Sequence, residues 1–320
     1  MIRKSRKISV LGTGNVGATI AYTLTQKGLC SELVLVDVNK EKAEGEALDL
    51  AQCEVCVPSS NIRSGEYSDV VDSDVIIVTF GIARKADQTR LELAKVNVGI
   101  IQSVMPTVAK YAPNALYIIV SNPVDVLTYA TIKCTGLPAN QVIGTGTLLD
   151  SNRLSQAIAT YCQVDVKNVN GFVFGEHGDA CMVPWSLCTV SGLPVKTYCT
   201  EILGKNPETL DAELEELYVG MKKSGSKVIK AKGATFYAIG ASTVHLVEAI
   251  LSDARTLLPL STVLNGEYGA KDMCMGVPCM VDASGLVKAV ELPITAEEQK
   301  LFAEKISAFE ETYNSLGIRN

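Results

Sequence analysis

One histidine of this sequence lies in a setting suited to proton transfer. His177 is flanked by glycines in the segment GEHGD, residues 175–179. Such a setting does not suit a packed core, and imidazole titrates near neutral pH, where it can donate or accept a proton. We therefore predict that His177 is a general acid or base. The other histidine, His245, lies between Val244 and Leu246, which favours a structural or partly exposed position on a helix.

Three glycines near the N-terminus have the spacing of a dinucleotide site. Gly12, Gly14 and Gly17 form a GxGxxG pattern between an apolar stretch at residues 7–11 and a helical stretch that ends near residue 28. Glycines at this spacing permit a tight turn, close approach of a pyrophosphate and packing of helix on strand. The N-terminus of the helix that follows favours phosphate.

An acidic residue completes this pattern. Asp37 lies near the end of the next apolar stretch, residues 33–38, and follows Gly17 by 20 residues. A carboxylate there accepts hydrogen bonds from ribose hydroxyls and repels a 2′-phosphate, so we predict NAD over NADP. Two alternatives stay open: a glycine-rich turn that binds nothing, and a Rossmann fold for another nucleotide, such as the methyl donor of methyltransferases.

The elements that must position these residues differ between the two halves of the chain. In the first half, strand-like stretches at residues 7–11, 33–38, 74–80 and 116–120 alternate with helical ones, which predicts a parallel sheet with helices on both faces. The second half combines shorter strands with long helices at residues 151–161, 213–251 and 296–316. We predict an α/β fold with a doubly wound parallel (Rossmann) NAD-binding domain, residues 1–145, and an α+β catalytic domain, residues 146–320.

Composition narrows the class of protein. Of the 320 residues, 47% are hydrophobic and 20% are charged, and the net charge is −6. No apolar run is long enough to cross a bilayer, no basic run suits a phosphate backbone, and glycines interrupt the apolar stretch behind the basic N-terminus before it could form an export signal. We expect a cytoplasmic protein with reduced thiols that binds neither membrane nor nucleic acid.

The cysteines do not form a convincing metal site. Cys53 and Cys56 are a CxxC pair, but a structural zinc site needs two further ligands, and His177 and His245 are far away in sequence. We predict no metal.

Four segments resemble the L-lactate/malate dehydrogenase family in order and spacing, and with the glycine pattern the resemblance runs nearly end to end. They are SNPVDVLTY at residues 121–129, GTGTLLDSNR at 144–153, GEHGD at 175–179 and KGATFYAIG at 232–240. The resemblance implies an NAD-dependent L-2-hydroxy-acid dehydrogenase, which transfers a hydride reversibly between NADH and a small 2-keto acid.

The resemblance also implies roles for individual residues. His177 would be the acid/base and Asp150 the carboxylate that orients it and stabilises its charged form. Arg153, three residues after Asp150 and so on the same helical face, would clamp the substrate carboxylate. The remaining substrate residues implied are Arg84, Arg90 in a closing loop, Asn122 and Thr235. The implied cofactor residues are Gly12, Gly14, Asn15, Val16, Gly17, Asp37, Thr79, Gly81, Val120 and Asn122.

The sequence gives conflicting signals about which keto acid is the substrate. Six residues before Arg90, lactate dehydrogenases usually carry Gln and malate dehydrogenases Arg, and this chain has Arg84. An arginine enclosed over pyruvate would lack a partner, whereas oxaloacetate supplies a second carboxylate, so Arg84 favours malate. Glu176, the pair Trp185 and Ser186, and Thr235 instead resemble lactate dehydrogenases, which remain the alternative.

Two further expectations come from the resemblance. Ser155 and Asn170 occupy positions where many bacterial relatives carry the Arg and His that bind fructose 1,6-bisphosphate, so we expect no activation by that sugar phosphate. A homotetramer or a dimer is expected from the family alone. The rival functions are a catalytically silent NAD-binding protein and an NAD- and metal-dependent glycosidase, which would need Cys and His ligands.

Overall fold

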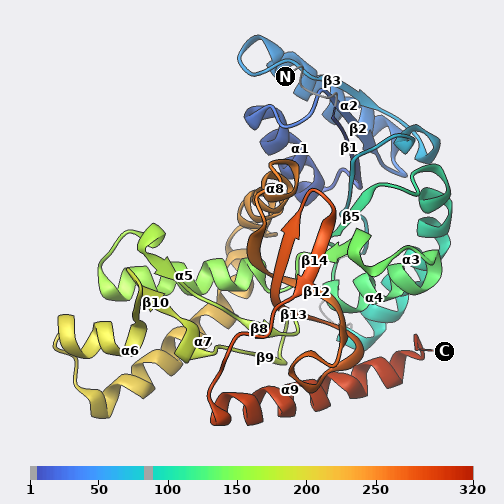
Figure 1. Cartoon of the computed structure of the whole chain (residues 1–320). Coiled ribbons are helices and arrows are strands. Elements are labelled where there is room, and N and C mark those ends of the chain that lie inside the picture. The colour runs from blue at the N-terminus through green and yellow to red at the C-terminus, as the bar shows by residue number, and fades with distance from the viewer. Residues whose placement is uncertain (1–5, 83–88, 320) are drawn as a thin grey trace.

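The computed structural model describes residues 6–82 and 89–319, and at Arg90 the main chain alone. Six parallel strands form the N-terminal part of the main sheet, in the spatial order β3, β2, β1, β4, β5, β6. Figure 1 labels β3, β2, β1 and β5 of this part of the sheet. Their central members are buried apolar runs, as expected for strands covered on both faces. The strands are β1 (Lys7–Leu11), β2 (Glu32–Val36), β3 (Asn61–Ser64), β4 (Val75–Val78), β5 (Leu116–Ile119) and β6 (Val142–Gly144).

Four long helices connect these strands and start or stop at capping residues. Gly28, in the left-handed conformation with φ 59°, ends the first helix, and Asn39 caps the second. Thr89 and Glu92 form a capping box at the start of the third. The helices are α1 (Asn15–Lys27), α2 (Lys40–Ala51), α3 (Arg90–Tyr111) and α4 (Val124–Thr135).

The main sheet does not stop at the end of the parallel strands. It continues antiparallel through β12, β13, β8 and β9, and β14 pairs with β13. Gly144 of β6 lies opposite Ser261 of β12, which joins the two halves. These strands are β8 (Phe174–Gly175), β9 (Cys181–Met182), β12 (Thr256–Asn265), β13 (Lys271–Asp282) and β14 (Gly285–Ala289), and a separate small sheet contains β7 (Val169–Asn170), β10 (Thr189–Val190) and β11 (Leu193–Pro194).

The helices of the second half correct one prediction. The single helix expected at residues 213–251 is wrong, because two helices, α7 and α8, are separated at Gly233, whose φ of 87° does not fit a helix. The C-terminal helix runs over the predicted residues and buries one apolar face against the sheet. The helices are α5 (Leu148–Cys162), α6 (Val195–Thr197), α7 (Pro207–Lys232), α8 (Tyr237–Leu251) and α9 (Ala296–Leu316).

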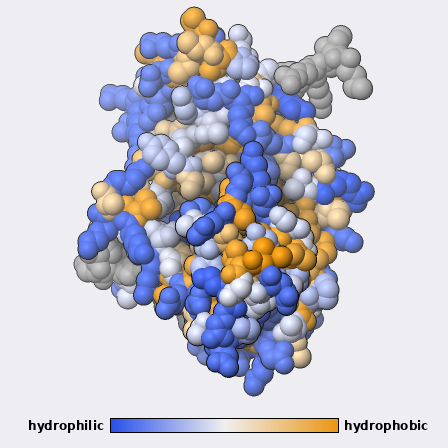
Figure 2. All heavy atoms as spheres, turned by 90° about the vertical axis from the view of Figure 1, so that its left-hand side faces the viewer, coloured by the Kyte–Doolittle hydropathy of each residue, from blue (hydrophilic) through white to orange (hydrophobic). Residues whose placement is uncertain are grey.

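Two clusters of buried apolar residues stabilise the described part of the chain. The larger one follows the main sheet through both halves, and the smaller one lies among α5, α7 and the small sheet. Hydrophilic side chains cover most of the face drawn in Figure 2, and hydrophobic ones form smaller groups between them. In residues 6–82 and 89–319, no helix combines the length and the apolar character needed to span a membrane.

Candidate active site

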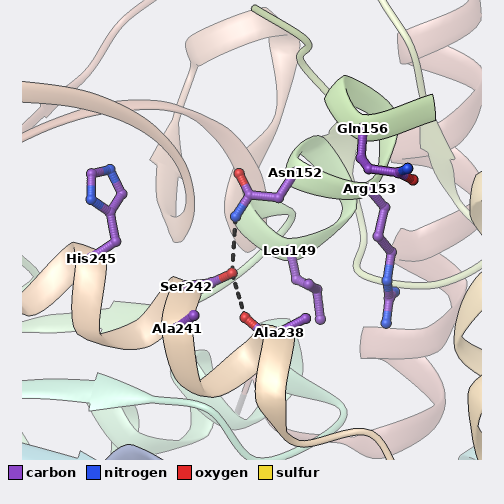
Figure 3. A pocket seen from close by; sticks show the side chains of 8 residues that line it. All are labelled: Leu149, Asn152, Arg153, Gln156, Ala238, Ala241, Ser242 and His245. Atoms are coloured by element: carbon purple, nitrogen blue, oxygen red, sulfur yellow. Dashed lines mark hydrogen bonds between the residues drawn. The ribbon is translucent and has the colours of Figure 1, made fainter. Parts of the chain in front are cut away.

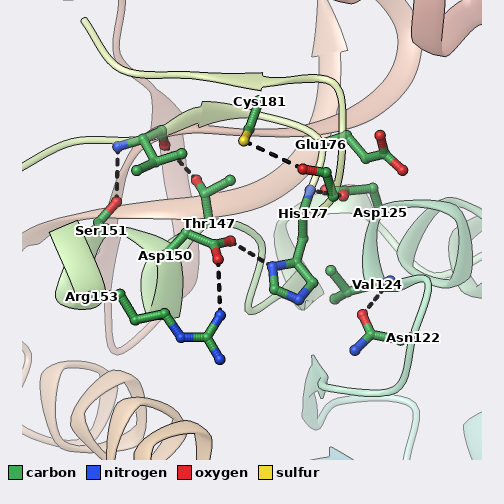
Figure 4. A network of polar contacts seen from close by, with 12 residues as sticks. Asn122, Val124, Asp125, Thr147, Asp150, Ser151, Arg153, Glu176, His177 and Cys181 are labelled. Carbon is green, nitrogen blue, oxygen red and sulfur yellow. Dashed lines mark hydrogen bonds and ion pairs between the residues drawn. The ribbon is translucent and has the colours of Figure 1, made fainter. Parts of the chain in front are cut away.

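His177 and Asp150 form a close pair in the structure. The Nδ1 atom of His177 lies 2.5 Å from Oδ2 of Asp150, although the residues are 27 positions apart in the sequence (Figure 4). Asp150 lies in the first turn of α5, and His177 lies in the loop that follows β8. The side chains are 24% and 10% exposed, so the imidazole still reaches the cavity while the carboxylate is largely covered. The pair therefore leaves Nε2 of His177 available to a ligand.

The two groups shift each other's ionisation. The negative charge of Asp150 raises the pKa of His177 above its ordinary value, although burial works in the opposite direction. Burial alone would raise the pKa of Asp150, but the charge and hydrogen bond of His177, together with Arg153, lower it. The arrangement thus favours an ionised carboxylate beside an imidazole that readily takes up a proton.

Arg153 joins the same network from the next turn of α5. Its Nη1 atom lies 3.2 Å from Oδ1 of Asp150, and its side chain is 19% exposed. Gly225 of α7 faces the guanidinium, since an added Cβ would lie 3.5 Å from Nη2. A charged, planar donor group therefore lies at the cavity with donors left over for an anion.

The cavity that contains His177 has a volume of about 190 Å³. Segments from both halves of the chain line it, and four predicted residues besides His177 and Arg153 are among them. They are Val16, Val120, Asn122 and Thr235. The sequence motifs of the two halves therefore converge on one site.

The glycine loop has little room for side chains. A Cβ at Gly17 would lie 1.9 Å from the carbonyl oxygen of Gly12, and Gly12 itself has φ 96° and lies against Phe80. Around Gly14, in contrast, no atom of the described residues lies within 4 Å of an added Cβ. No side chain of the described residues caps α1, which begins at Asn15, so its first N–H groups face this open space. The loop fits a pyrophosphate at Gly14.

Thr79, which follows β4, contacts the glycine loop through its side chain. Its hydroxyl donates to the carbonyl oxygen of Gly12 at 2.8 Å and lies against Gly17. Gly81 follows two residues later, in an exposed position near Asn97. Thr79, predicted as a cofactor residue, therefore fixes the main chain of the glycine loop.

Asp37 lies at the carboxyl end of β2 and is fixed by main-chain donors. The amide of Thr13 donates to Oδ2 at 2.6 Å and the amide of Asn39 donates to Oδ1 at 2.9 Å. Partial burial opposes ionisation, but these hydrogen bonds lower the pKa of Asp37. An ionised carboxylate is thus held beside the glycine loop, where a ribose would lie.

Some predicted residues cannot be compared with the structure. Arg84 lies outside the described residues, and only the main chain of Arg90, at the first position of α3, is described. Their suggested contacts with substrate stay predictions.

The structure adds a residue that the sequence did not single out. Asn97 of α3 is 2% exposed, and its Nδ2 atom donates to the carbonyl oxygen of Asn122 at 2.7 Å. Its Oδ1 atom accepts a hydrogen bond from the amide of Ile82 at 2.9 Å. Asn97 thereby joins two loops at the carboxyl ends of β4 and β5. The sequence signal that could have identified Asn97 is that it is a polar residue on an otherwise apolar face of α3.

A larger cavity of about 400 Å³ lies between α5 and α8 and shares Leu149 and Arg153 with the cavity of His177. His245 lines it together with Gln156, and Ser242 accepts a hydrogen bond from Asn152 there at 2.9 Å (Figure 3). His245 is exposed on α8 and does not line the cavity of His177. The two histidines therefore line different cavities, although these cavities adjoin at Leu149 and Arg153.

Ser155 and Asn170 offer no charge at the positions considered for a sugar bisphosphate. The hydroxyl of Ser155 accepts a hydrogen bond from the amide N–H of Gly171 at 3.1 Å, and Asn170 is exposed on β7. Among the residues that the structure describes, no three His, Cys, Asp or Glu side chains are grouped so as to hold a metal ion.

Comparisons with known proteins cover almost the whole chain. Residues 6–144 match the model of the lactate/malate dehydrogenase NAD binding domain, and residues 147–315 match that of the lactate/malate dehydrogenase alpha/beta C-terminal domain. L-lactate dehydrogenase 1 of Clostridium acetobutylicum is 41% identical over 316 residues, which is 98% of this chain and all of the relative. An L-lactate dehydrogenase of Clostridium botulinum is 42% identical over 98% of both chains. The crystal structure of minor L-lactate dehydrogenase from Enterococcus mundtii, in the ligands-bound form, superposes with a TM-score of 0.92 at 39% identity and covers 98% of this chain and 99% of that one.

Proposed function

Since this chain belongs to the lactate/malate dehydrogenase family, we propose that it is an NAD-dependent L-lactate dehydrogenase, which interconverts pyruvate and lactate. The pairing of His177 with Asp150 beside Arg153 in one cavity carries the reaction class. The choice of lactate is supported by relatives named L-lactate dehydrogenase that are 41% and 42% identical to nearly the whole chain. The malate preference that Arg84 suggested finds no such support.

The proposed reaction requires one proton and one hydride. In the direction of reduction, His177 donates the proton from Nε2 to the carbonyl oxygen of the keto acid, and the resulting neutral imidazole stays bound to Asp150. In the direction of oxidation, His177 takes the hydroxyl proton, and the charge of Asp150 stabilises the imidazolium. When bound, the nicotinamide supplies or accepts the hydride. A raised pKa of His177 suits both directions near neutral pH.

Arg153 would hold the carboxylate of the substrate. A guanidinium offers five N–H donors in one plane, and only one of its nitrogens contacts Asp150 in this chain. A two-point contact with the substrate fixes the orientation of the keto group toward Nε2 of His177. Asn122 and Thr235, which line the same cavity, would contact the substrate from the remaining sides, and Arg90 would close over it.

The NAD site would be formed by the glycine loop and Asp37. The main chain at Gly14 and Asn15 would take the pyrophosphate, and Asp37 would accept the ribose hydroxyls. Val16 and Val120 would border the nicotinamide, because both line the cavity that also contains His177. This proposal is consistent with the match of residues 6–144 to an NAD binding domain.

Malate dehydrogenase is the second candidate, and it rests on one residue. Oxaloacetate has a second carboxylate that would pair with the positive charge of Arg84, whereas pyruvate has no second carboxylate.

Steady-state kinetics with NADH decide between the substrates. We expect kcat/KM for pyruvate to exceed that for oxaloacetate. Should Arg84 set the preference instead, oxaloacetate will be favoured in the wild type, and Arg84→Gln will shift the ratio toward pyruvate by about 10-fold or more, as expected for one unpaired charge. Equal inactivity toward both keto acids would exclude both candidates.

The coenzyme preference tests Asp37. We expect wild-type kcat/KM for NADH to exceed that for NADPH, because the ionised carboxylate repels a 2′-phosphate. Asp37→Ser removes the charge and should narrow the ratio by about 10-fold, an effect of about 1.4 kcal/mol. Glu41→Gln, an acidic residue of the first turn of α2, is the control and should leave the ratio unchanged. An unchanged ratio in Asp37→Ser would contradict the assignment.

A further inference from the structure

A second carboxyl group contacts His177, at the main chain and not at the ring. Asp125 is the second residue of α4 and is 1% exposed. Its Oδ2 atom accepts the amide N–H of His177 at 2.8 Å, and its Oδ1 atom accepts the hydroxyl of Ser261 at 2.6 Å. The hydroxyl of Tyr313 lies 3.2 Å from the main-chain oxygen of Asp125. Elements from both halves of the chain therefore meet at this carboxyl.

The loop that carries His177 needs such a contact. β8 ends at Gly175 and β9 starts at Cys181, so the amide of His177 lies outside the strand pairing. Within the loop, the amide of Gly178 donates to the carbonyl oxygen of Glu176 at 2.8 Å. The contact with Asp125 instead ties the loop to the core, because α4 is packed against β12 and β13.

We infer that Asp125 is a positioning residue, which fixes the main chain of His177 so that its ring meets both Asp150 and the substrate. The inference rests on the proposed function. Figure 4 shows the two carboxyls on opposite sides of His177, with Asp150 at the ring and Asp125 at the main chain. Together they fix both ends of the residue, and a displacement of about 1 Å at such a site costs about 10²-fold in rate.

The hydrogen bonds of Asp125 do not require a negative charge. Burial raises the pKa of Asp125 to about 7, while the hydrogen bonds of Ser261 and His177 lower it. A protonated carboxyl keeps one oxygen for the amide of His177 and donates from the other to Ser261, whose hydroxyl serves as donor or acceptor. An asparagine side chain offers the same oxygen and an NH₂ donor. Positioning and charge are therefore separable by substitution.

Two substitutions of Asp125 and one control make the test. Asp125→Asn keeps both contacts, and we expect kcat to stay within about threefold of wild type. Asp125→Ser is too short to reach the amide of His177 but leaves a hydroxyl near Ser261, and we expect kcat to fall by about 10²-fold. Ser261→Ala removes the other hydrogen bond of the same carboxyl and should lower Tm while kcat stays within about threefold.

For all three variants we would measure kcat and KM for reduction of the keto acid, the Kd of NADH and Tm. A positioning role predicts that Asp125→Ser loses kcat, with the Kd of NADH unchanged. A kcat in Asp125→Ser equal to wild type, or an equal loss of kcat in Ser261→Ala, overturns the inference. If Asp125→Ser does not fold, Asp125→Asn decides, since a loss of more than about tenfold in kcat would mean that charge and not position matters.

The wild type separates this inference from the proposed function. It is assayed with NADH and both pyruvate and oxaloacetate. Inactivity toward both overturns the proposed function and the inference together. An active wild type with an equally active Asp125→Ser overturns the role of Asp125 alone.

Discussion

Replacement of His177 by Asn is expected to lower kcat for keto-acid reduction by about 10² to 10⁴-fold, the contribution of a general acid. Asparagine keeps hydrogen-bonding capacity and fits the volume, but it has no proton to transfer at neutral pH. Stopped-flow binding of NADH should give a Kd within about threefold of wild type. The proposed contacts with pyrophosphate and ribose are made by the glycine loop and Asp37, which the substitution does not change.

The other histidine provides the control for this experiment. His245→Asn changes an exposed residue of α8 that does not line the cavity of His177, so its kcat should equal that of the wild type. The pH profile gives a second check. Because the charge of Asp150 raises the pKa of His177, reduction should persist above the ordinary titration range of histidine and then fall as His177 loses its proton. Normal turnover in His177→Asn would remove this residue from the reaction.

Replacement of Arg153 by Gln is expected to lower kcat/KM for the keto acid by about 10² to 10³-fold. Loss of one partner of an enclosed charge pair costs about 2 to 5 kcal/mol, and the substrate carboxylate would lose its cation. Arg153→Lys should fall between Gln and wild type, because lysine keeps the charge but not the planar pair of donors. The rates are measured at several keto-acid concentrations so that KM and kcat are separated.

A neighbouring residue of the same helix controls for damage to α5. Gln156 lies one turn after Arg153, is exposed, and lines the larger cavity. Gln156→Ala should therefore leave kcat/KM within about twofold. If Arg153→Gln shows the same kcat/KM as this control, Arg153 does not bind the substrate.

Local patterns in the sequence predicted the parallel half of the fold well. A glycine pattern after an apolar strand, and Asp37 after the next one, are short-range signals, and the structure brings them to one edge of the sheet. The break at residues 233–236 was missed because the sequence on both sides favours a helix and the only local sign of the break is one glycine, Gly233. The boundary predicted near residue 145 stays a prediction, since the main sheet continues from β6 into β12.

The site was predicted in part. His177 was predicted from its glycine-flanked setting and from the family resemblance, and Asp150 from the resemblance alone; their contact joins positions 27 residues apart. Asn97 and Asp125 were not singled out as functional, because their partners lie on other elements and no local spacing identifies them. Polar residues buried in apolar helices were the available signal, since such groups need hydrogen-bond partners. Arg84, on which the predicted malate preference rested, lies outside the described residues.

Ser261 takes part in two contacts that join different elements of the structure. It is the residue of β12 that lies opposite Gly144 of β6, and its hydroxyl holds the carboxyl of Asp125 below His177. A side chain at Gly144 would collide with Ser261, since an added Cβ would lie 2.8 Å from the Cβ of that serine. The contact between Asp125 of α4 and the amide of His177 joins the same two halves, so under the proposed role of Asp125 turnover depends on this seam even where the hydroxyl of Ser261 is dispensable. In a denaturant series, an activity assay would report when this seam opens, without any spectroscopic label.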